Sequence, residues 1–343
     1  MAEDFDAFMA RVRAQVEARL EAWLDARVAA AREQGRDVFA VADGVRELTL
    51  RGGKRLRPVL LAAGYVACGG ADAETVTMAG VALELFQTYL LAHDDFMDGD
   101  AVRRGGPSLP ALMRAGFAQH ADAMAILAGD LACAWAQRAL LEVDLPAERV
   151  LRASRELAKV HDQVVAGQVL DVVAASGDAP AVEAVHALKT ASYTVRGPVL
   201  MGAHLAGGTD EQVAALTAFA EPLGVAFQLR DDVLGTFGDA AVTGKPTGND
   251  LREGKRTALV VEALADVGAG AALARVLGRR DADGAEIQAA MAAIEACGAR
   301  ARIEARTFDL ADRSREALEH APLTPGGRAL LERAAGALTE RRG

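Results

Sequence analysis

The chain has 343 residues, of which 51% are hydrophobic, 25% are charged and 4% are aromatic. This balance excludes a disordered chain and a disulfide-rich scaffold, and the few aromatic residues disfavour an all-β fold. The formal net charge of −10 comes from acidic residues spread along the chain, so nucleic-acid binding, which needs a basic surface, is not expected. The widely spaced cysteines, Cys68, Cys133 and Cys297, are interpreted as small core residues in a reducing cytoplasm.

The N-terminal segment is acidic and amphipathic, unlike the basic and then apolar start of a signal peptide. No uninterrupted apolar run reaches the ~18 residues of a membrane-spanning helix. The sequence therefore predicts a soluble, cytoplasmic protein with no membrane span.

The predicted elements are helices, because helix-favouring residues dominate and apolar residues recur at helical spacing. A first amphipathic helix is expected over about residues 5–32, and a second ends near Arg51, where Gly52 and Gly53 stop it. Pro58 fits the first turn of the next helix. Further helical patterns cover roughly 74–99, 122–142, 147–175, 179–206, 209–236, 254–277, 282–320 and 324–340. With no strand-like alternation, linker or repeat, the pattern predicts a single all-α domain over residues 1–343.

Three aspartates, Asp94, Asp95 and Asp98, stand at the end of an apolar helical stretch. At about 100° per residue, Asp94 and Asp98 lie about 40° apart on one side of the helix. Like charges one turn apart repel, and a divalent cation would remove that cost. Carboxylates suit Mg²⁺ or Mn²⁺, which take phosphate oxygens as further ligands. The alternative is an acidic helix end that only faces solvent.

A second acidic pair, Asp231 and Asp232, ends another apolar helix, and the two clusters are compatible with one shared cavity. Basic residues stand in segments between and around them, namely Lys54, Arg55, Arg57, Arg103, Arg104, Lys189, Lys245, Lys255 and Arg256. Arginine makes forked contacts with phosphate and lysine acts as a mobile charge. Carboxylates, metal and cations together therefore predict a diphosphate site, although the GxxxxGK[ST] phosphate-binding loop does not occur.

Several motifs in this order resemble those of the trans-isoprenyl diphosphate synthases, the polyprenyl synthetase family. They are GGKRLRP at 52–58, DDFMD at 94–98 followed by RRG, Gly129-Asp130, GQVLD at 167–171, Lys189-Thr190, FQLRDD at 227–232 and GKPTGNDLREGKRT at 244–257. The resemblance implies a helical bundle around a deep apolar cavity, built as a homodimer. It also implies condensation of isopentenyl diphosphate with a dimethylallyl, geranyl or farnesyl diphosphate through ionisation, condensation and proton loss.

The resemblance assigns roles to individual residues. Three Mg²⁺ ions would hold the allylic diphosphate on Asp94, Asp98 and Asp231, with Asp95 and Asp232 in support. Cationic contacts to that diphosphate would come from Arg103, Lys189, Lys245 and Lys255. Isopentenyl diphosphate would bind without metal on Gly53, Lys54, Arg57, Gln87 and Arg104. The side-chain oxygens of Thr190 and Gln228 would face the allylic cation.

The chemistry of the reaction gives an independent reason for placing metal and cations around the diphosphate. Breaking the allylic C–O bond gathers negative charge on the departing diphosphate, which metal and cations stabilise most in the transition state. A dry cavity protects the carbocation from water. The departed diphosphate is the nearest base for the final proton, since no protein base stands out. His93 is interpreted as a helix-surface residue or as one that supports the acidic motif from behind, because imidazole is not a preferred Mg²⁺ ligand.

The chain departs from the family pattern at Gly235, where a third carboxylate is usual, which leaves the metal affinity of the second motif open. A single aromatic residue at this place, Tyr89, which lies five residues before Asp94 and next to Leu90, resembles the pattern of geranylgeranyl diphosphate synthases. Around the helix Leu90 lies about 40° from Asp94, Phe86 about 80° and Tyr89 about 140°, so Tyr89 also fits ordinary core. A geranylgeranyl product is favoured, farnesyl is the alternative, and the bulk at 86 and 89 disfavours longer products.

Two other classes compete with a chain-elongating enzyme. A terpene cyclase also uses an aspartate-rich motif with Mg²⁺, but it needs no isopentenyl site, so GGKRLRP and RRG count against it. A regulatory subunit of a heteromeric synthase is expected to have eroded acidic motifs, and only Gly235 points that way.

Overall fold

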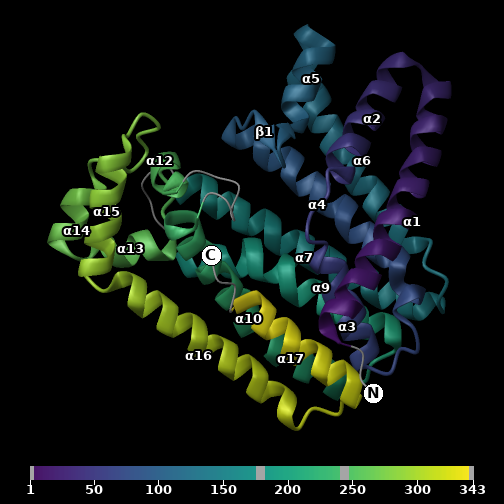
Figure 1. Ribbon diagram of the computed structural model, residues 1–343. Helices are drawn as coiled ribbons and strands as arrows, with labels where there is room; N and C mark the ends of the chain where they lie inside the picture. The colour runs from purple at the N-terminus through teal and green to yellow at the C-terminus, as the bar shows by residue number, and fades with distance from the viewer. Residues whose placement is uncertain (1–3, 175–181, 240–246, 340–343) are drawn as a thin grey trace. The chain divides into compact units, whose positions relative to one another are not determined.

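The computed structural model describes residues 4–174, 182–239 and 247–339, and these are almost entirely helical (Figure 1). The predicted all-α fold class is confirmed. The helices form two compact units, each built from separate stretches of the chain. The first unit comprises Met1–Leu157, Pro198–Val213 and Leu323–Leu331, and the second comprises Ala158–Gly197, Ala214–Pro322 and Glu332–Gly343. The single-domain organisation expected from the sequence stays a prediction.

The first unit is organised around a long apolar helix, α4 (Thr77–Asp98), which packs against α6 (Ala121–Leu141), α3 (Leu56–Ala67) and α1 (Phe5–Gln34). Its other elements are α2 (Arg36–Leu50), η1 (Ala73–Val76), β1 (Val102–Arg103), β2 (Gly106–Pro107), α5 (Leu109–Phe117), η2 (Ala118–His120), the start of α7 (Ala147–Ala174), α9 (Gly197–Ala206), the first residues of α10 (Asp210–Phe237) and the first half of α17 (Pro325–Thr339). The rings of Trp23 and Trp135 meet edge to face with centroids 5.9 Å apart, as expected for core aromatics.

A short hairpin that the sequence does not predict follows α4. Strands β1 and β2 pair antiparallel, Val102 with Pro107 and Arg103 with Gly106. The connecting residues Arg104 and Gly105 both have positive φ, 52° and 72°, which matches the twist of a two-residue hairpin turn. Strands of two residues are too short to show an alternating pattern, so the sequence analysis missed them.

The second unit has its own hydrophobic core. It contains the rest of α7, α8 (Val182–Val185), the π-helix η3 (His186–Arg196), most of α10, α12 (Asn249–Glu253), α13 (Ala258–Leu264), α14 (Val267–Leu273), α15 (Gly284–Ala296), α16 (Ala299–Glu319) and the end of α17. The core is formed by side chains of α10, α12, α13 and α15. Four of them are each at most 1% exposed, namely Leu229, Leu251, Leu259 and Ile287. This cluster anchors the end of α10 that carries the second acidic pair.

Two of the predicted helices of this unit are interrupted. The expected helix over 254–277 becomes α13 and α14, because the side chain of Asp266 accepts a hydrogen bond from Ala269 N at 2.9 Å and starts a new helix. The expected helix over 282–320 breaks at Gly298, whose φ is 77°. Apolar spacing continues across both breaks, so periodicity alone does not show them.

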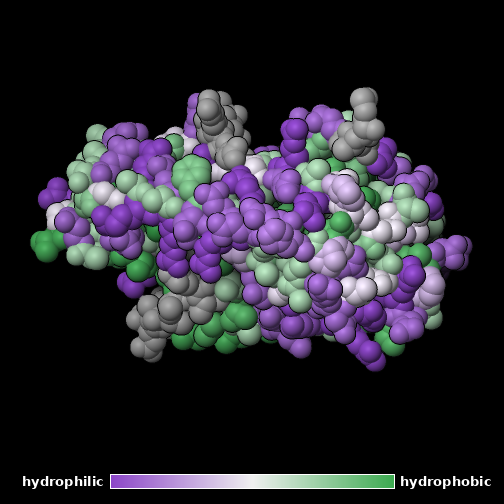
Figure 2. All heavy atoms as spheres, turned by 90° about the horizontal axis from the view of Figure 1, so that it is seen from below, coloured by the Kyte–Doolittle hydropathy of each residue, from purple (hydrophilic) through white to green (hydrophobic). Residues whose placement is uncertain are grey.

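Two stretches, Ala73–Asp98 and Leu109–Leu141, are long and apolar enough to cross a membrane by length and composition. The most apolar window of Ala73–Asp98 is 72% buried inside the protein, as in the core helices of many globular proteins, and that of Leu109–Leu141 is 44% buried. On the face drawn in Figure 2, hydrophilic residues are interspersed with hydrophobic ones. Burial therefore accounts for the hydrophobicity of α4.

Candidate active site

The first acidic cluster lies at the C-terminal end of α4. Gly99, with a φ of 69°, ends the helix directly after Asp98. Asp94 is half-buried and Asp98 is exposed. A helix C-terminus carries partial negative charge, so carboxylates there are disfavoured by the helix dipole as well as by each other. An incoming cation would offset both costs, and the metal role of Asp94 and Asp98 stays a prediction.

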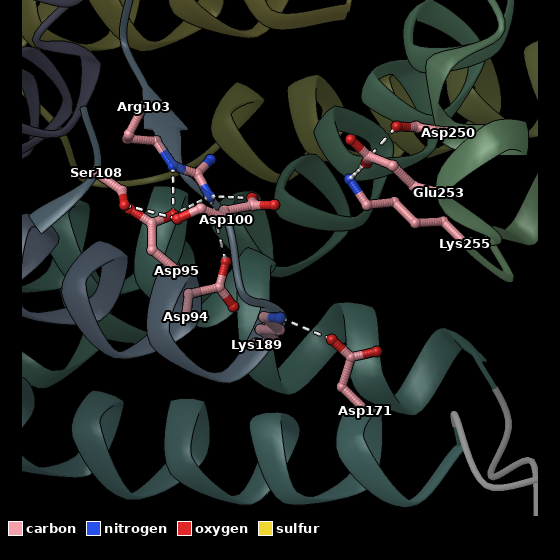
Figure 3. A network of polar contacts seen from close by, with 10 residues as sticks. All are labelled: Asp94, Asp95, Asp100, Arg103, Ser108, Asp171, Lys189, Asp250, Glu253 and Lys255. Atoms are coloured by element: carbon pink, nitrogen blue, oxygen red, sulfur yellow. Dashed lines mark hydrogen bonds and ion pairs between the residues drawn. The ribbon is translucent and has the colours of Figure 1, made fainter. Parts of the chain in front are cut away.

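The third aspartate of this cluster is engaged inside the protein. Asp95 is fully buried, and Arg103 Nε donates a hydrogen bond to its Oδ1 at 2.7 Å. Arg103 Nη2 also lies 3.1 Å from Asp100 Oδ2 and 4.0 Å from Asp94 Oδ2 (Figure 3). Burial raises the pKa of Asp95 to about 6, although the contacts with Arg103 oppose the shift. Asp95 therefore orients Arg103, which fits the supporting role expected for it.

The hairpin that carries Arg103 and Arg104 contacts the segment that joins α2 to α3. Arg51 Nη1 donates to the carbonyl oxygens of Arg103, at 3.2 Å, and of Pro107, so the end of α2 is tied to both strands. At the turn, a Cβ atom on Gly53 would lie 3.8 Å from Arg104 Nη2. The structure thus brings together Gly53 and Arg104, two of the residues predicted to bind isopentenyl diphosphate. Lys54, Arg57 and Gln87 belong to the same unit, and their roles stay predictions.

Arg55 belongs to the core. It is 3% exposed and forms an ion pair with Glu84, which is also 3% exposed. Its Nη2 donates to Thr49 O at 3.0 Å, and its φ of 48° lies in the left-handed region. Arg55, counted with the basic residues of this segment but given no substrate role by the resemblance, thus lies in the core and holds the GGKRLRP segment in place. No local signal in the sequence separates it from its exposed neighbour Lys54.

The second acidic pair also divides into a buried and an exposed residue. Asp232 is 2% exposed; its Oδ1 accepts from Gln228 Nε2 at 2.8 Å and its Oδ2 from Ala258 N at 3.0 Å. Burial raises the pKa of Asp232 to about 7, against the effect of these hydrogen bonds. Asp231 is exposed. Asp232 thus links α10 to the start of α13, while the role of Asp231 as metal ligand and of Gln228 toward the carbocation stay predictions.

Gly235 makes room for another carboxylate. A Cβ atom at this position would lie 1.9 Å from Oδ2 of Asp250, a residue of α12. Asp250 Oδ1 in turn lies 3.4 Å from Lys255 Nζ, which is also 2.7 Å from Glu253 Oε2 (Figure 3). Although partial desolvation opposes the shift, these carboxylates raise the pKa of Lys255, whose side chain is 48% exposed, well above its usual value. The carboxylate of Asp250, which helps to hold Lys255, therefore occupies the space beside Gly235.

Lys189 and Thr190 lie on the π-helix η3. Lys189 Nζ lies 2.7 Å from Asp171 Oδ2 of the GQVLD motif (Figure 3). A Cβ atom on Gly167 would come within 2.6 Å of Lys189 N, so the glycine of this motif permits the close approach of α7 and η3. Thr190 is half-buried beside Lys189. Lys245 lies outside the described residues, and its role stays a prediction.

The donor set fits a metal that shares its ligands with a substrate. In the part of the chain that the structure describes, no three His, Cys, Asp or Glu side chains form a ready metal site. The α4 pair offers two carboxylates one turn apart and so leaves further positions to phosphate oxygens and water, an arrangement that Mg²⁺ accepts. The residues therefore fit Mg²⁺ bound together with a diphosphate.

The residues predicted to set the product length lie on α4, one to two turns before the acidic cluster. Phe86 and Tyr89 are 1% and 9% exposed, with ring centroids 5.4 Å apart, and Leu90 is half-buried. His93 contacts α6, where its Nε2 lies 3.2 Å from Ile126 O. His93 is thus only partly a surface residue, and its imidazole is engaged with backbone.

Comparison with known proteins identifies the family. Residues 40–294 match the model of the polyprenyl synthetase family. The chain is 35% identical over 251 residues to a short chain isoprenyl diphosphate synthase of Methanocaldococcus jannaschii, covering 72% of this chain and 73% of that protein. It is 33% identical over 328 residues to nonaprenyl diphosphate synthase of Mycobacterium tuberculosis, covering 94% and 91%.

Among solved structures, the geranylgeranyl pyrophosphate synthase of Corynebacterium glutamicum, crystallised with isoprenyl diphosphate and magnesium, is similar over 99% of this chain and 100% of its own. The TM-score is 0.87 and the identity 34%. The chain belongs to the polyprenyl synthetase family. It is a prenyltransferase of the trans-prenyl diphosphate synthase type.

Proposed function

We propose that the chain elongates an allylic diphosphate with isopentenyl diphosphate in a Mg²⁺-dependent reaction and releases mainly geranylgeranyl diphosphate. The observation that carries this proposal is the carboxylate pair Asp94 and Asp98 at the end of α4, next to an arginine that Asp95 holds. The relative from Corynebacterium glutamicum, with its bound isoprenyl diphosphate and magnesium, supports the ligands.

The proposal gives each residue a distinct task. Asp94, Asp98 and Asp231 hold Mg²⁺, which when bound neutralises the charge of the departing diphosphate. The guanidinium of Arg103 is fixed through Nε and Nη2, so its plane is set before the substrate arrives. Lys189, oriented by Asp171, adds a cationic contact. Such prearranged charges stabilise the transition state more than the substrate.

The bond changes are balanced. The allylic C–O bond breaks and the diphosphate leaves with the electron pair. The isopentenyl double bond then forms the new C–C bond, and the product loses one proton to the departed diphosphate. Thr190 and Gln228 are proposed to face the allylic cation, while Lys54, Arg57, Gln87 and Arg104 hold the isopentenyl diphosphate. Lys245 and Lys255 are proposed to complete the charged surroundings of the allylic diphosphate.

The geranylgeranyl product is supported by the large rings of Phe86 and Tyr89 on α4 and by the name of the Corynebacterium glutamicum relative. The Mycobacterium tuberculosis relative makes a longer product by its name, so product length needs a direct measurement. Purified protein incubated with labelled isopentenyl diphosphate, dimethylallyl or farnesyl diphosphate and Mg²⁺ is expected to give geranylgeranyl diphosphate. A farnesyl product would correct the chain length, and no elongation would favour a regulatory subunit or a terpene cyclase.

We also propose a cytoplasmic homodimer. Helix α7 presents the apolar side chains Val165, Val169 and Val172, which are 46%, 56% and 53% exposed. Their spacing of four and three residues puts them on one stripe, and such stripes favour burial against another chain. Light scattering coupled to size exclusion is expected to give twice the 35.8 kDa chain mass. A monomer would refute this part of the proposal.

A further inference from the structure

Three ring side chains follow one another along α4. The centroids of Phe86 and Tyr89 are 5.4 Å apart, and those of Tyr89 and His93 are 4.9 Å apart with the ring planes at 73°. Steps of three and four residues place these side chains on neighbouring turns. The ring of Tyr89 is therefore held between two ring neighbours on its own helix.

The His93 end of this column rests on α6. The imidazole Nε2 lies 3.2 Å from Ile126 O and 3.7 Å from Asp130 Oδ1. A Cβ atom on Gly129 would lie 2.3 Å from Nε2 and 2.4 Å from Cδ2 of His93, far inside contact distance. The imidazole therefore occupies the space that any side chain at residue 129 would need.

Helix α6 packs extensively against α4. Burial raises the pKa of the Tyr89 phenol, and the α6 residues Cys133 and Asp130 add to the shift. Cys133 follows Gly129 by one turn, in the same way that His93 follows Tyr89 on α4. Two turns of α6 thus face two turns of α4 at this point.

We propose that Gly129 and His93 are positioning residues that hold the ring of Tyr89, and that this contact between α6 and α4 sets the length of the prenyl product. The inference rests on the proposed function, in which Tyr89 stops the growing chain. A tightly packed ring keeps one rotamer. Displacing or removing the imidazole opens space beside Tyr89, lets its ring turn aside and allows further elongation.

A double-mutant cycle tests this coupling. His93→Ala removes the imidazole, Gly129→Ala expels it, and the double variant has no ring to expel. Gly116→Ala on α5 is the matched control, because a Cβ there has nothing within 4 Å. The readout is the ratio of products longer than geranylgeranyl to geranylgeranyl itself, measured by chromatography after dephosphorylation. A general loss of stability or of turnover does not by itself move this ratio.

Each single variant is expected to raise the ratio about tenfold, equivalent to ~1.4 kcal/mol of selectivity. Gly116→Ala leaves it unchanged, and the double variant matches His93→Ala, because Gly129 acts only through the imidazole. If Gly129→Ala alone does not fold, as judged by circular dichroism, the double variant still decides the question, since it lacks the imidazole with which the new methyl group would clash.

Two results would overturn the inference: unchanged ratios in the His93 variants while Tyr89→Ala lengthens the products, or an equal effect of Gly129→Ala with and without His93. Both leave the proposed function intact. Failure of the unmodified protein to elongate any allylic diphosphate would instead refute the proposed function.

Discussion

Removing Glu84 is expected to destabilise the first unit strongly. Its partner Arg55 is 3% exposed, so in Glu84→Ala the guanidinium stays buried with its main counter-charge gone. Thr49 O still accepts from Nη2, and Glu17 lies 3.5 Å from Nε, but neither replaces the buried carboxylate. The perturbation therefore tests whether this ion pair anchors the segment between α2 and α3.

The magnitude follows from burial. Breaking a buried ion pair by removing one partner costs about 3–5 kcal/mol. In a cooperative unit of roughly 150–250 residues this lowers the melting temperature by about 6–20 °C. The matched control is Asp25→Ala, because Asp25 pairs with Arg46 at 2.7 Å with side chains 56% and 30% exposed. An exposed pair of this kind contributes under about 1 kcal/mol.

Differential scanning calorimetry of the two variants and the unmodified protein provides the measurement. The melting temperature of the first unit is expected to be much lower in the Glu84→Ala variant than in the Asp25→Ala variant. Equal melting temperatures for the two variants would refute the role of the Arg55–Glu84 ion pair as an anchor, and a normal melting temperature with lost isopentenyl diphosphate binding would instead give Arg55 a role at the substrate site.

Three further changes address the chemistry. Asp98→Asn is expected to lower turnover about 10²-fold or more and to raise the Mg²⁺ concentration for half-maximal activity; unchanged Mg²⁺ titration curves would contradict a metal role. Gly235→Ala drives Asp250 away from Lys255, so the KM for the allylic diphosphate is expected to rise about tenfold; Gly284→Ala, whose Cβ has nothing within 4 Å, is the control and leaves KM unchanged. Asp171→Asn is expected to cost under about 1 kcal/mol of stability, because its pair with Lys189 is 48% and 27% exposed, yet to slow turnover; normal turnover would show that Asp171 does not orient the lysine.

Local periodicity was enough to predict most helices and the acidic end of α4, because residues three and four apart share a face whatever the rest of the chain does. The breaks at Asp266 and Gly298 depend on a single cap or a single positive φ. Such events leave the apolar pattern unchanged. They became visible only with the backbone.

The site was predictable as a set of residues but not as a set of contacts. The sequence, through its family resemblance, assigned Asp95 and Asp232 a supporting role beside Asp94 and Asp231, but it could not show that both are buried or which groups hold them. Asp232 is held by Ala258, 26 positions away, and Arg55 by Glu84, 29 positions away. Interactions between such distant residues leave no local trace in the sequence.

The position of the Asp250 carboxylate beside Gly235 has a consequence for engineering in which residue 235 is replaced by an acid to match the family pattern. An acid introduced at 235 would bring a second carboxylate into the space that Asp250 occupies, so Asp250 would have to move and its contact with Lys255 is expected to weaken. The effect of a substitution at 235 is therefore expected to depend on the residue at 250.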